Sequence, residues 1–189
     1  MRFERFLLDR WIERKFSGEC KIHRDFTASS GPSWKLRELL DLDGGEAADR
    51  LLDLPVTYPS AESLAELAIR CRDAIFARAQ TVSRTNLQVI EAGWPREDDT
   101  VRWIRPDGGF TVFPWFPGIV DTRPLCERLG ARGLLVVPED CFGIPEHIRV
   151  GFGSQREGFG EAFDALRTEV RVYLRQERQG STATVPSPR

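Results

Sequence analysis

The stretch EHIRVGFG, residues 146–153, places a single arginine inside a short apolar run. Ile148 and Val150 flank Arg149, and this alternation indicates a buried β-strand. A buried guanidinium needs an anion, because an unpaired charge in a protein interior costs on the order of several kcal/mol. The anion is either a carboxylate of the chain or that of a ligand, which a planar guanidinium binds through two parallel hydrogen bonds. The carboxylates close by in the sequence are Glu139, Asp140 and Glu146.

Other residues with metal-binding or nucleophilic chemistry are scattered. The four cysteines show no CxxC pairing and the two histidines are far apart, so we expect reduced thiols and no zinc site. The formal net charge is −2 without a basic block, which argues against nucleic-acid binding. No apolar run approaches the roughly 20 residues of a membrane span, and the N-terminus has no signal-peptide core. We therefore expect a cytoplasmic protein that binds neither membrane nor metal.

The elements that must position Arg149 follow from hydrophobic periodicity and from turn residues. The segment before it, PDGG within RPDGGFTVFPWF, predicts a β-hairpin, and residues 16–33 are polar and prone to turns. Strands that alternate with helices in this order favour an α/β protein, a two-layer α+β sandwich. We expect a small mixed or antiparallel sheet of about four strands packed on helices. The predicted helices are 2–14, 34–42, 61–93, 121–129 and 159 onward; the predicted strands are 101–105, 110–116, 134–138 and 147–153.

The order of these motifs is similar to that of a known enzyme family. A long helix, then RPDGGFTVFPWF, LCERLGARGLLVVPEDCFG, EHIRVGFG and a closing helix resembles the small domain of class I/II aminotransferases, pyridoxal-phosphate enzymes of fold type I. The nearest branch is that of capreomycidine synthase-like enzymes, and the resemblance covers about residues 67–175. Residues 1–66 resemble the N-terminal arm of such enzymes. The large cofactor domain between these two parts has no counterpart here, and the two parts join near Glu66–Ala68.

The resemblance implies roles for individual residues. Arg149 matches the arginine that holds the α-carboxylate of the amino-acid substrate. Gly31 and the hydroxyls of Ser29 and Ser30 lie in the loop TASSGPS, which the family places near the substrate; the alternative is a plain polar turn before a helix. Glu139 stands where the family has PG, and a negative charge near the substrate entrance would oppose carboxylate binding.

Transamination also needs a lysine for the Schiff base, an acid for the pyridinium nitrogen and a phosphate cup. The three lysines are Lys15, Lys21 and Lys35, and none stands at the position of the family's Schiff-base lysine. Lys35 is expected to be a surface residue, and the pyridinium-pairing aspartate has no match either. We therefore predict no catalytic, cofactor-binding or metal-binding residue, and no cofactor in this chain alone. Pyridoxal phosphate is implied only by the family resemblance.

These observations predict a helical N-terminal arm (1–60), an aminotransferase-like small domain (61–176) and a disordered tail (177–189). The expected function is that of a truncated aminotransferase-like protein that binds an amino-acid carboxylate and is not catalytic alone. Two alternatives stay open: a subunit that completes the active site of a partner aminotransferase carrying the large domain, or a non-enzymatic homodimer. The aromatic surface of the hairpin needs a cover, either the apolar stripe of the N-terminal helix or a second chain, and in the homodimer another copy covers it.

Overall fold

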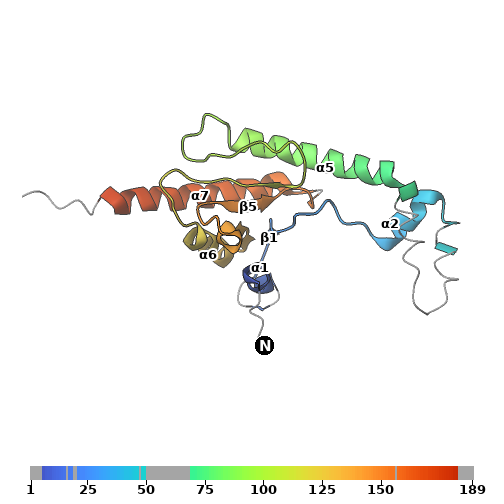
Figure 1. Ribbon diagram of the computed structural model, residues 1–189, viewed down its shortest axis with the longest axis horizontal. Coiled ribbons are helices and arrows are strands. Elements are labelled where there is room, and N and C mark those ends of the chain that lie inside the picture. The colour runs from blue at the N-terminus through green and yellow to red at the C-terminus, as the bar shows by residue number, and fades with distance from the viewer. Residues whose placement is uncertain are drawn as a thin grey trace, which may run out of the picture.

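Two long helices form the framework of the molecule. The computed structural model describes residues 6–15, 17–18, 21–46, 48–49, 69–155 and 157–182. Within these residues, α5 (Arg72–Gly93) and α7 (Phe159–Thr182) pack against each other and run side by side in Figure 1. The apolar residues of α7 recur at helical spacing, and Phe163, Leu166 and Val170 are fully buried as a result.

The strands are short and form two sets. β5 (Ile148–Gly151) is the centre of a three-stranded antiparallel set, between β2 (Thr111–Val112) and β4 (Val137–Pro138). In this set Val137 is the partner of Arg149, and Thr111 is the partner of Gly151. The second set pairs β1 (Arg24–Asp25) with β3 (Leu134–Leu135) in parallel.

The remaining described helices are shorter and each has a local anchor. α6 (Arg123–Ala131) starts with Pro124 in its first turn, where a missing N–H costs nothing. α1 (Leu7–Ile12), which continues into η1 (Glu13–Lys15), is held by Trp11, whose indole Nε1 donates to Val136 O at 2.5 Å. η3 (Glu139–Phe142) follows β4 directly and leads toward β5.

α2 (Leu36–Leu40) and the η2 turn that follows it (Asp41–Asp43) lie apart from the strands, beside the start of α5 (Figure 1). Arg78 of α5 makes this connection. Its Nη2 donates to Ser33 O at 2.7 Å, its Nη1 contacts Glu38 Oε2 at 3.1 Å, and its guanidinium lies over the Trp34 ring. The core begins further along α5, where Asn86, Leu87 and Ile90 are buried.

The predicted fold class is confirmed: small sheets pack against helices in a mixed α/β arrangement. The N-terminal residues do not stand apart from this core, because Trp11 and Phe26 are buried in the same cluster as α7. The proposed junction at Glu66–Ala68 and residues 183–189 lie outside the described residues. The division into three segments therefore stays a proposal.

Three local predictions were wrong, and one open alternative is not realised. The hairpin is reduced to one pair, Arg102 with Trp115, and β2 pairs with β5 instead, because prolines at 106, 114 and 117 interrupt a regular ladder. The polar segment 16–33 contains β1, whose two residues are too few for a visible alternation. The stripe of the N-terminal helix, one of the two covers left open for the hairpin, instead docks through Trp11, whose indole Nε1 donates to Val136 O. Residues 177–182 continue α7, since Glu177, Arg178 and Gln179 are good helix formers.

Candidate functional site

Arg149 lies on the face of β5 that the N-terminal segment covers. Alternate residues of a strand point to opposite faces, so Ile148 and Val150 enter the core while Arg149 and Gly151 share the other face. A Cβ on residue 151 would lie 2.9 Å from Phe26 O and closer still to Ala28 O, which places residues 26–28 directly over this face. The glycine of RVGFG thus lets the segment approach the strand closely enough to reach the arginine.

The guanidinium of Arg149 is only weakly bonded within the protein. Its Nη2 donates to Thr27 O at 3.4 Å, and its Nε is buried without a hydrogen-bond partner. The Phe142 ring lies 5.5 Å from the guanidinium carbon, within cation–π range. Arg149 forms none of the ion pairs seen among the described residues. Asp140 pairs with Arg123, and Glu146 lies beside His147. The structure thus shows a half-buried cation with unused donors.

A turn in the N-terminal segment places the carbonyl that Arg149 contacts. Asp25 Oδ1 accepts from Thr27 N at 2.9 Å and from Thr27 Oγ1 at 2.7 Å, which bends the chain just after β1. Short polar side chains form such local bonds to the backbone two residues on. The bend directs Thr27 O toward the Nη2 of Arg149.

The three carboxylates near Arg149 in sequence are placed differently. Asp140 pairs with Arg123, Oδ2 to Nε at 2.5 Å and Oδ1 to Nη2 at 2.6 Å. Glu146 lies 3.7 Å from His147 Nδ1. Glu139 is 4% exposed, and its Oε1 is buried without a partner. A structural salt bridge to Arg149, one of the two interpretations of the sequence, is therefore not formed by any of the three.

Glu139 lies in the interior and not at an entrance, contrary to the position expected for it. Burial raises the pKa of its carboxyl above the ordinary glutamate range, the positive charge of Arg149 acts in the opposite direction, and Asp140 raises this pKa further. The net shift is upward because desolvation outweighs the attraction of Arg149. Two groups of opposite charge thus share the site without pairing.

The Glu139→Gln variant is expected to be more stable than the wild type at high pH. A raised pKa in the folded state means that the wild type keeps its full stability while Glu139 is protonated, and loses stability as pH rises through that pKa. The difference in unfolding free energy between variant and wild type should therefore grow as the pH rises above the ordinary range of a glutamate. Urea unfolding at a series of pH values measures it, with the exposed Glu157→Gln as matched control. A difference that does not change with pH would contradict the expectation.

The other two predicted site residues lie on the same segment but do not contact Arg149. Gly31 packs against Phe110 and Ala79, since a Cβ there would lie 3.3 Å from Phe110 Cζ, and Ser30 is exposed. Neither residue forms a hydrogen bond with the guanidinium; that contact belongs to Thr27.

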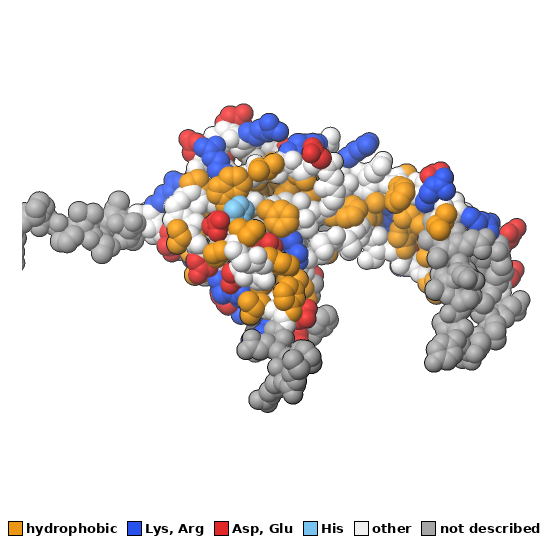
Figure 2. Space-filling model, in the orientation of Figure 1, with side chains coloured by type: hydrophobic (Ala, Val, Ile, Leu, Met, Phe, Trp, Pro, Cys, Tyr) orange, Lys and Arg blue, Asp and Glu red, His pale blue; other side chains and the backbone are white. Residues whose placement is uncertain are grey.

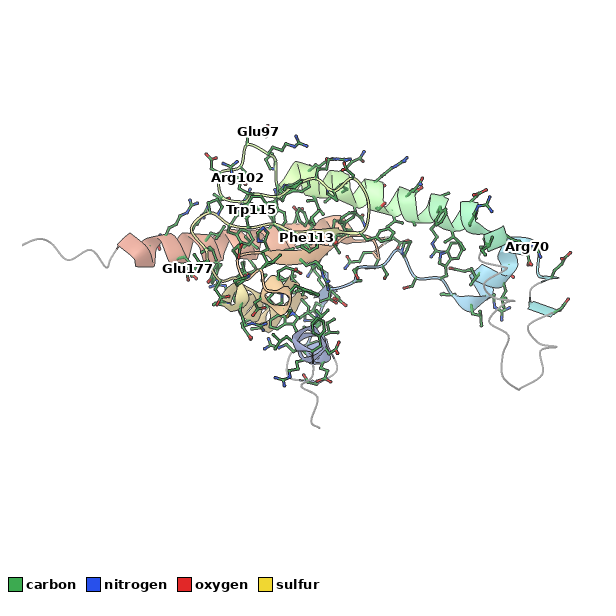
Figure 3. The ribbon with its side chains drawn as sticks, in the orientation of Figure 1. Arg70, Glu97, Arg102, Phe113, Trp115 and Glu177 are labelled. Atoms are coloured by element: carbon green, nitrogen blue, oxygen red, sulfur yellow. The ribbon has the colours of Figure 1, made fainter. Side chains whose placement is uncertain are left out.

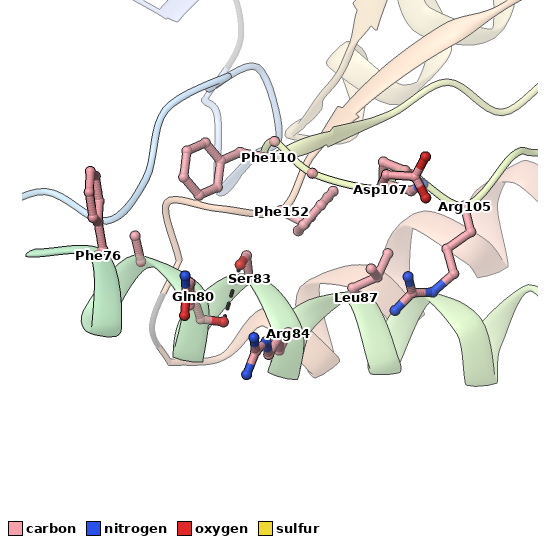
Figure 4. Close-up of a pocket in the computed structure, with 13 residues that line it drawn as sticks. Phe76, Gln80, Ser83, Arg84, Leu87, Arg105, Asp107, Phe110 and Phe152 are labelled. Atoms are coloured by element: carbon pink, nitrogen blue, oxygen red, sulfur yellow. Dashed lines mark hydrogen bonds between the residues drawn. The ribbon is translucent and has the colours of Figure 1, made fainter. Parts of the chain in front are cut away.

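A concavity between α5 and the turn at residues 105–110 is lined in part by Ala79 and Phe110, the neighbours of Gly31 (Figure 4). Its volume is about 410 Å³, and Arg84, Arg105 and Asp107 are its charged lining residues. Arg105 is already paired with Glu91 at 2.6 Å. None of the lining side chains is a buried polar group without a partner, in contrast to Arg149 and Glu139. Of the Arg149 site and this concavity, only the Arg149 site contains buried polar side-chain atoms without a hydrogen-bond partner.

Comparison with known proteins shows which proteins this chain is similar to. No family model matches the chain. It is 32% identical to capreomycidine synthase of Streptomyces vinaceus over 124 residues, 65% of this chain and 32% of that protein. In the solved structure of the PLP-dependent cyclase OrfR, 68% of this chain superposes on 35% of the other with a TM-score of 0.51 and 27% identity. This chain is similar to part of the fold type I aminotransferases.

A second solved structure has a similar fold. The α-aminoadipate aminotransferase LysN of Thermus thermophilus superposes on 61% of the chain with a TM-score of 0.53 and 24% identity, which is a likeness of fold. The chain spans about a third of the length of each of these proteins: 32% of the synthase, 35% of the cyclase and 31% of LysN. The predicted resemblance to fold type I aminotransferases is confirmed as a similarity of sequence and fold over part of their length.

The lysines of the aminotransferase-like chain do not fit pyridoxal phosphate as far as they are described. Lys21 and Lys35 are exposed, and neither lines a described pocket or meets an acidic group within one. The side chain of Lys15 lies outside the described residues. The cofactor requires a lysine and an acid that converge on one site, and the described lysines do not form such a site.

The structure adds residues that the sequence did not single out. Phe142 covers the guanidinium from η3, and Thr27 supplies its acceptor through a backbone carbonyl, which no side-chain pattern reveals. Asn86 of α5 donates from Nδ2 to Phe152 O at 2.8 Å and to Gln155 O at 2.7 Å, holding the chain just after β5. The pair Asp25-x-Thr27 was the one available signal, because this spacing is typical of a side-chain turn.

Proposed function

We propose that this aminotransferase-like chain is a binding module that holds an amino-acid carboxylate through Arg149 and performs no cofactor chemistry of its own. The observation that carries the proposal is the guanidinium of Arg149, half-buried on a covered face of β5 and without a carboxylate partner among the described residues. A carboxylate bound at the guanidinium would make the two parallel hydrogen bonds that are typical of this pair.

The surroundings of the guanidinium support a small ligand. Phe142 and the segment at Thr27 fix the side chain from two sides, so little conformational freedom is lost when an anion binds. Gly31 and Ser30 follow Thr27 on the same segment, and the proposal places them toward the far end of an elongated ligand. Reduced thiols at Cys126 and Cys141, both buried, support a cytoplasmic setting.

Replacing Arg149 by glutamine is expected to weaken the binding of L-alanine by tenfold or more. The loss of a charge-assisted bidentate contact is worth on the order of 1.5–3 kcal/mol, and each 1.4 kcal/mol is about a factor of ten. Isothermal titration calorimetry, with ¹H–¹⁵N NMR to follow the arginine Nε–H signals, measures the affinity. The exposed Arg84→Gln, in the other concavity, is the matched control and should bind as the wild type does.

Two results would contradict the proposal. Equal affinity in Arg149→Gln and wild type would remove the arginine from the binding site. A stoichiometric adduct of the purified chain with pyridoxal phosphate, trapped by borohydride on one of the three lysines, would contradict the absence of cofactor chemistry.

A second candidate function is that of a subunit that completes the site of a partner carrying the large domain. The supporting observation is an uncovered apolar surface: Figure 2 shows hydrophobic side chains gathered over the centre of one face. Phe113 and Trp115 line a shallow pocket there (Figure 3), with Phe113 44% and nearby Ile104 77% exposed. An exposed cluster of this kind is typical of an interaction site. Light scattering measures the mass of the particle and separates this candidate from the homodimer. A complex with a protein that carries the large domain supports the partner subunit, and a particle of twice the chain mass supports the homodimer.

No described helix is both long enough and apolar enough to cross a membrane. The described residues also contain no group of three or more His, Cys, Asp or Glu side chains placed to hold a metal ion. The proposed ligand is therefore argued from Arg149 and its neighbours alone.

A further inference from the structure

We propose that the free edge of β2 binds an extended segment of a partner protein, apolar in its middle and acidic at one end. The inference does not depend on the carboxylate site at Arg149, nor on a partner that carries a large cofactor domain. It starts from an unfinished hairpin, in which outward backbone groups of β2 have no partner among the described residues. Another chain can add a strand to an edge of this kind.

The hydrogen-bond pattern shows which backbone groups face outward. Ile148 N donates to Pro114 O at 3.0 Å, so the carbonyl of residue 114 points toward β5. Because backbone groups alternate between the two sides of an antiparallel strand, Thr111 and Phe113 direct their N–H and C=O groups away from β5. Within the part of the chain that the structure describes, these outward groups form no hydrogen bond. They are the free edge.

The segment that should cover this edge does not pair with it. Arg102 N and Trp115 N each donate to the other's carbonyl at 2.9 Å, and the same register would next pair Ile104 with Phe113. That second pair does not form, and Pro106, the next residue in line, has no N–H to donate. Residues of both segments instead line a concavity of about 340 Å³. The free edge is therefore accessible from outside.

The side chains around this concavity favour an apolar guest. Ile104 is 77% and Phe113 44% exposed, and Trp115 lines the same concavity (Figure 3). None of the lining residues is an aspartate, glutamate, lysine or arginine. A strand that carries valine or isoleucine would cover this exposed apolar surface while its backbone bonds the edge.

A neighbouring concavity determines the charge of the guest. It shares Ile104 and Trp115 with the first, has a volume of about 370 Å³, and is lined by Arg96, Arg102 and Arg105 without an acidic residue. A segment that leaves the first concavity on this side meets cations only. Complementary charge at such a place steers a partner and fixes its orientation.

Arg96 is the cation that a partner can use in full. Arg102 Nη2 is paired with Asp99 at 2.8 Å, and Arg105 Nε is paired with Glu91 at 2.6 Å. The guanidinium of Arg96 has no hydrogen bond or ion pair among the residues that the structure describes; only its backbone carbonyl is bonded, by Arg102 Nη1. A carboxylate of the guest would take this position.

The turn and the flanking segment select the orientation and the occupant. Asp107 lies in the turn at the opposite end of the edge from Arg102, so an acidic end is favoured toward the arginines and disfavoured toward the turn. In a second copy of the chain the same edge is flanked by its own segment 102–106. Two such edges cannot meet without displacing these segments, whereas a single extended segment enters between them.

The test uses synthetic peptides and the full chain. Fluorescence anisotropy of fluorescein-labelled VTVTVDD-amide should show binding to the wild type, and VTVTVKK-amide should bind about fivefold or more weakly. A form of the first peptide with all backbone amides N-methylated keeps its side chains but has no donors for the edge. It should bind about tenfold or more weakly than the parent peptide.

Two variants locate the contact. Thr111→Pro removes an outward N–H and leaves the bonds of β2 to β5 in place, so it should weaken the aspartate peptide about tenfold or more. Arg96→Glu should remove the preference for aspartate over lysine, and Arg84→Glu, in the concavity beside α5, should keep it. Far-ultraviolet circular dichroism confirms that each variant is folded.

Each outcome decides the inference. Equal binding of the aspartate, lysine and N-methylated peptides, or binding of none, would overturn it. A particle of twice the chain mass that excludes the peptide would assign the edge to a second copy and overturn it as well. Arg149→Gln should bind the peptide as the wild type does, so this inference and the proposed carboxylate binding fail separately. The peptide series needs no variant, so a Thr111→Pro chain that fails to fold does not remove the test.

Discussion

Replacing Gly151 by alanine is expected to destabilise the protein by more than about 3 kcal/mol, a large part of the stability of an ordinary domain. The new methyl group would lie 2.9 Å from Phe26 O and still closer to Ala28 O. Both atoms belong to backbone, so neither can swing away as the end of a flexible side chain would.

The same backbone is held in place by hydrogen bonds. Gly151 N donates to Phe26 O at 2.7 Å, and Phe26 N donates to Leu135 O at 2.8 Å. Moving residues 26–28 away from β5 would break these bonds and open the core around the fully buried Phe26 ring. It would also withdraw Thr27 O from Arg149, so loss of stability and loss of the site should occur together.

Gly160→Ala is the matched control for this substitution. Nothing lies within 4 Å of a Cβ at residue 160, which is in the first turn of α7. Alanine there should leave stability unchanged or raise it by about 0.5–1 kcal/mol, since it lowers the entropy of the unfolded chain. Thermal and urea unfolding monitored by circular dichroism compare the two. A folded Gly151→Ala with near wild-type stability would show that residues 26–28 do not cover β5 as described.

The Asn86→Ala variant is expected to lose about 2–4 kcal/mol of unfolding free energy. Asn86 is 4% exposed, and its Nδ2 is the donor to two carbonyls, Phe152 O and Gln155 O. Truncation leaves these acceptors in the interior without a donor, and each such loss costs about 1–3 kcal/mol. Gln155 is itself bonded to Asp25 O through Nε2 at 2.9 Å, so the chain after β5 is tied to both α5 and β1.

The exposed Gln88→Ala, two residues further along α5, is the control and should change stability by less than about 0.5 kcal/mol. Guanidinium chloride unfolding by intrinsic tryptophan fluorescence gives both values, because Trp94 is buried at the end of the same helix. If Asn86→Ala and Gln88→Ala prove equally mild, the two carbonyls are satisfied by water, and the junction after β5 is not held by α5.

Part of the site was predictable because it depends on residue type. An arginine between Ile148 and Val150 indicates a strand with one charged position, whatever its neighbours are. The helical spacing from Phe159 to Tyr173 predicts α7 equally well, since it follows from the period of a helix. The family resemblance was visible for a similar reason, because it rests on short motifs in a fixed order along the sequence.

Other parts depended on contacts between residues far apart in the chain. Glu139 looked like a charge near an entrance, and its burial arises because η3 folds back beside β5. The regular hairpin does not form because Thr111 and Val112 pair with β5, and only Trp115 keeps its partner Arg102. The prolines interrupt the ladder between the two segments, which local turn chemistry does not reveal.

The sequence by itself determined the fold class, the long helices and the presence of a lone arginine on a strand, because each follows from periodicity or from residue type within a short window. Only the tertiary structure decided that Arg149 has no carboxylate partner among the described residues, that its acceptor is a carbonyl 122 residues away, and that Glu139 is buried diagonal to it. The physical reason is that pairing and burial are set by which distant segments meet, and at this site the contact that matters is made by backbone, which carries no signature in the side chains.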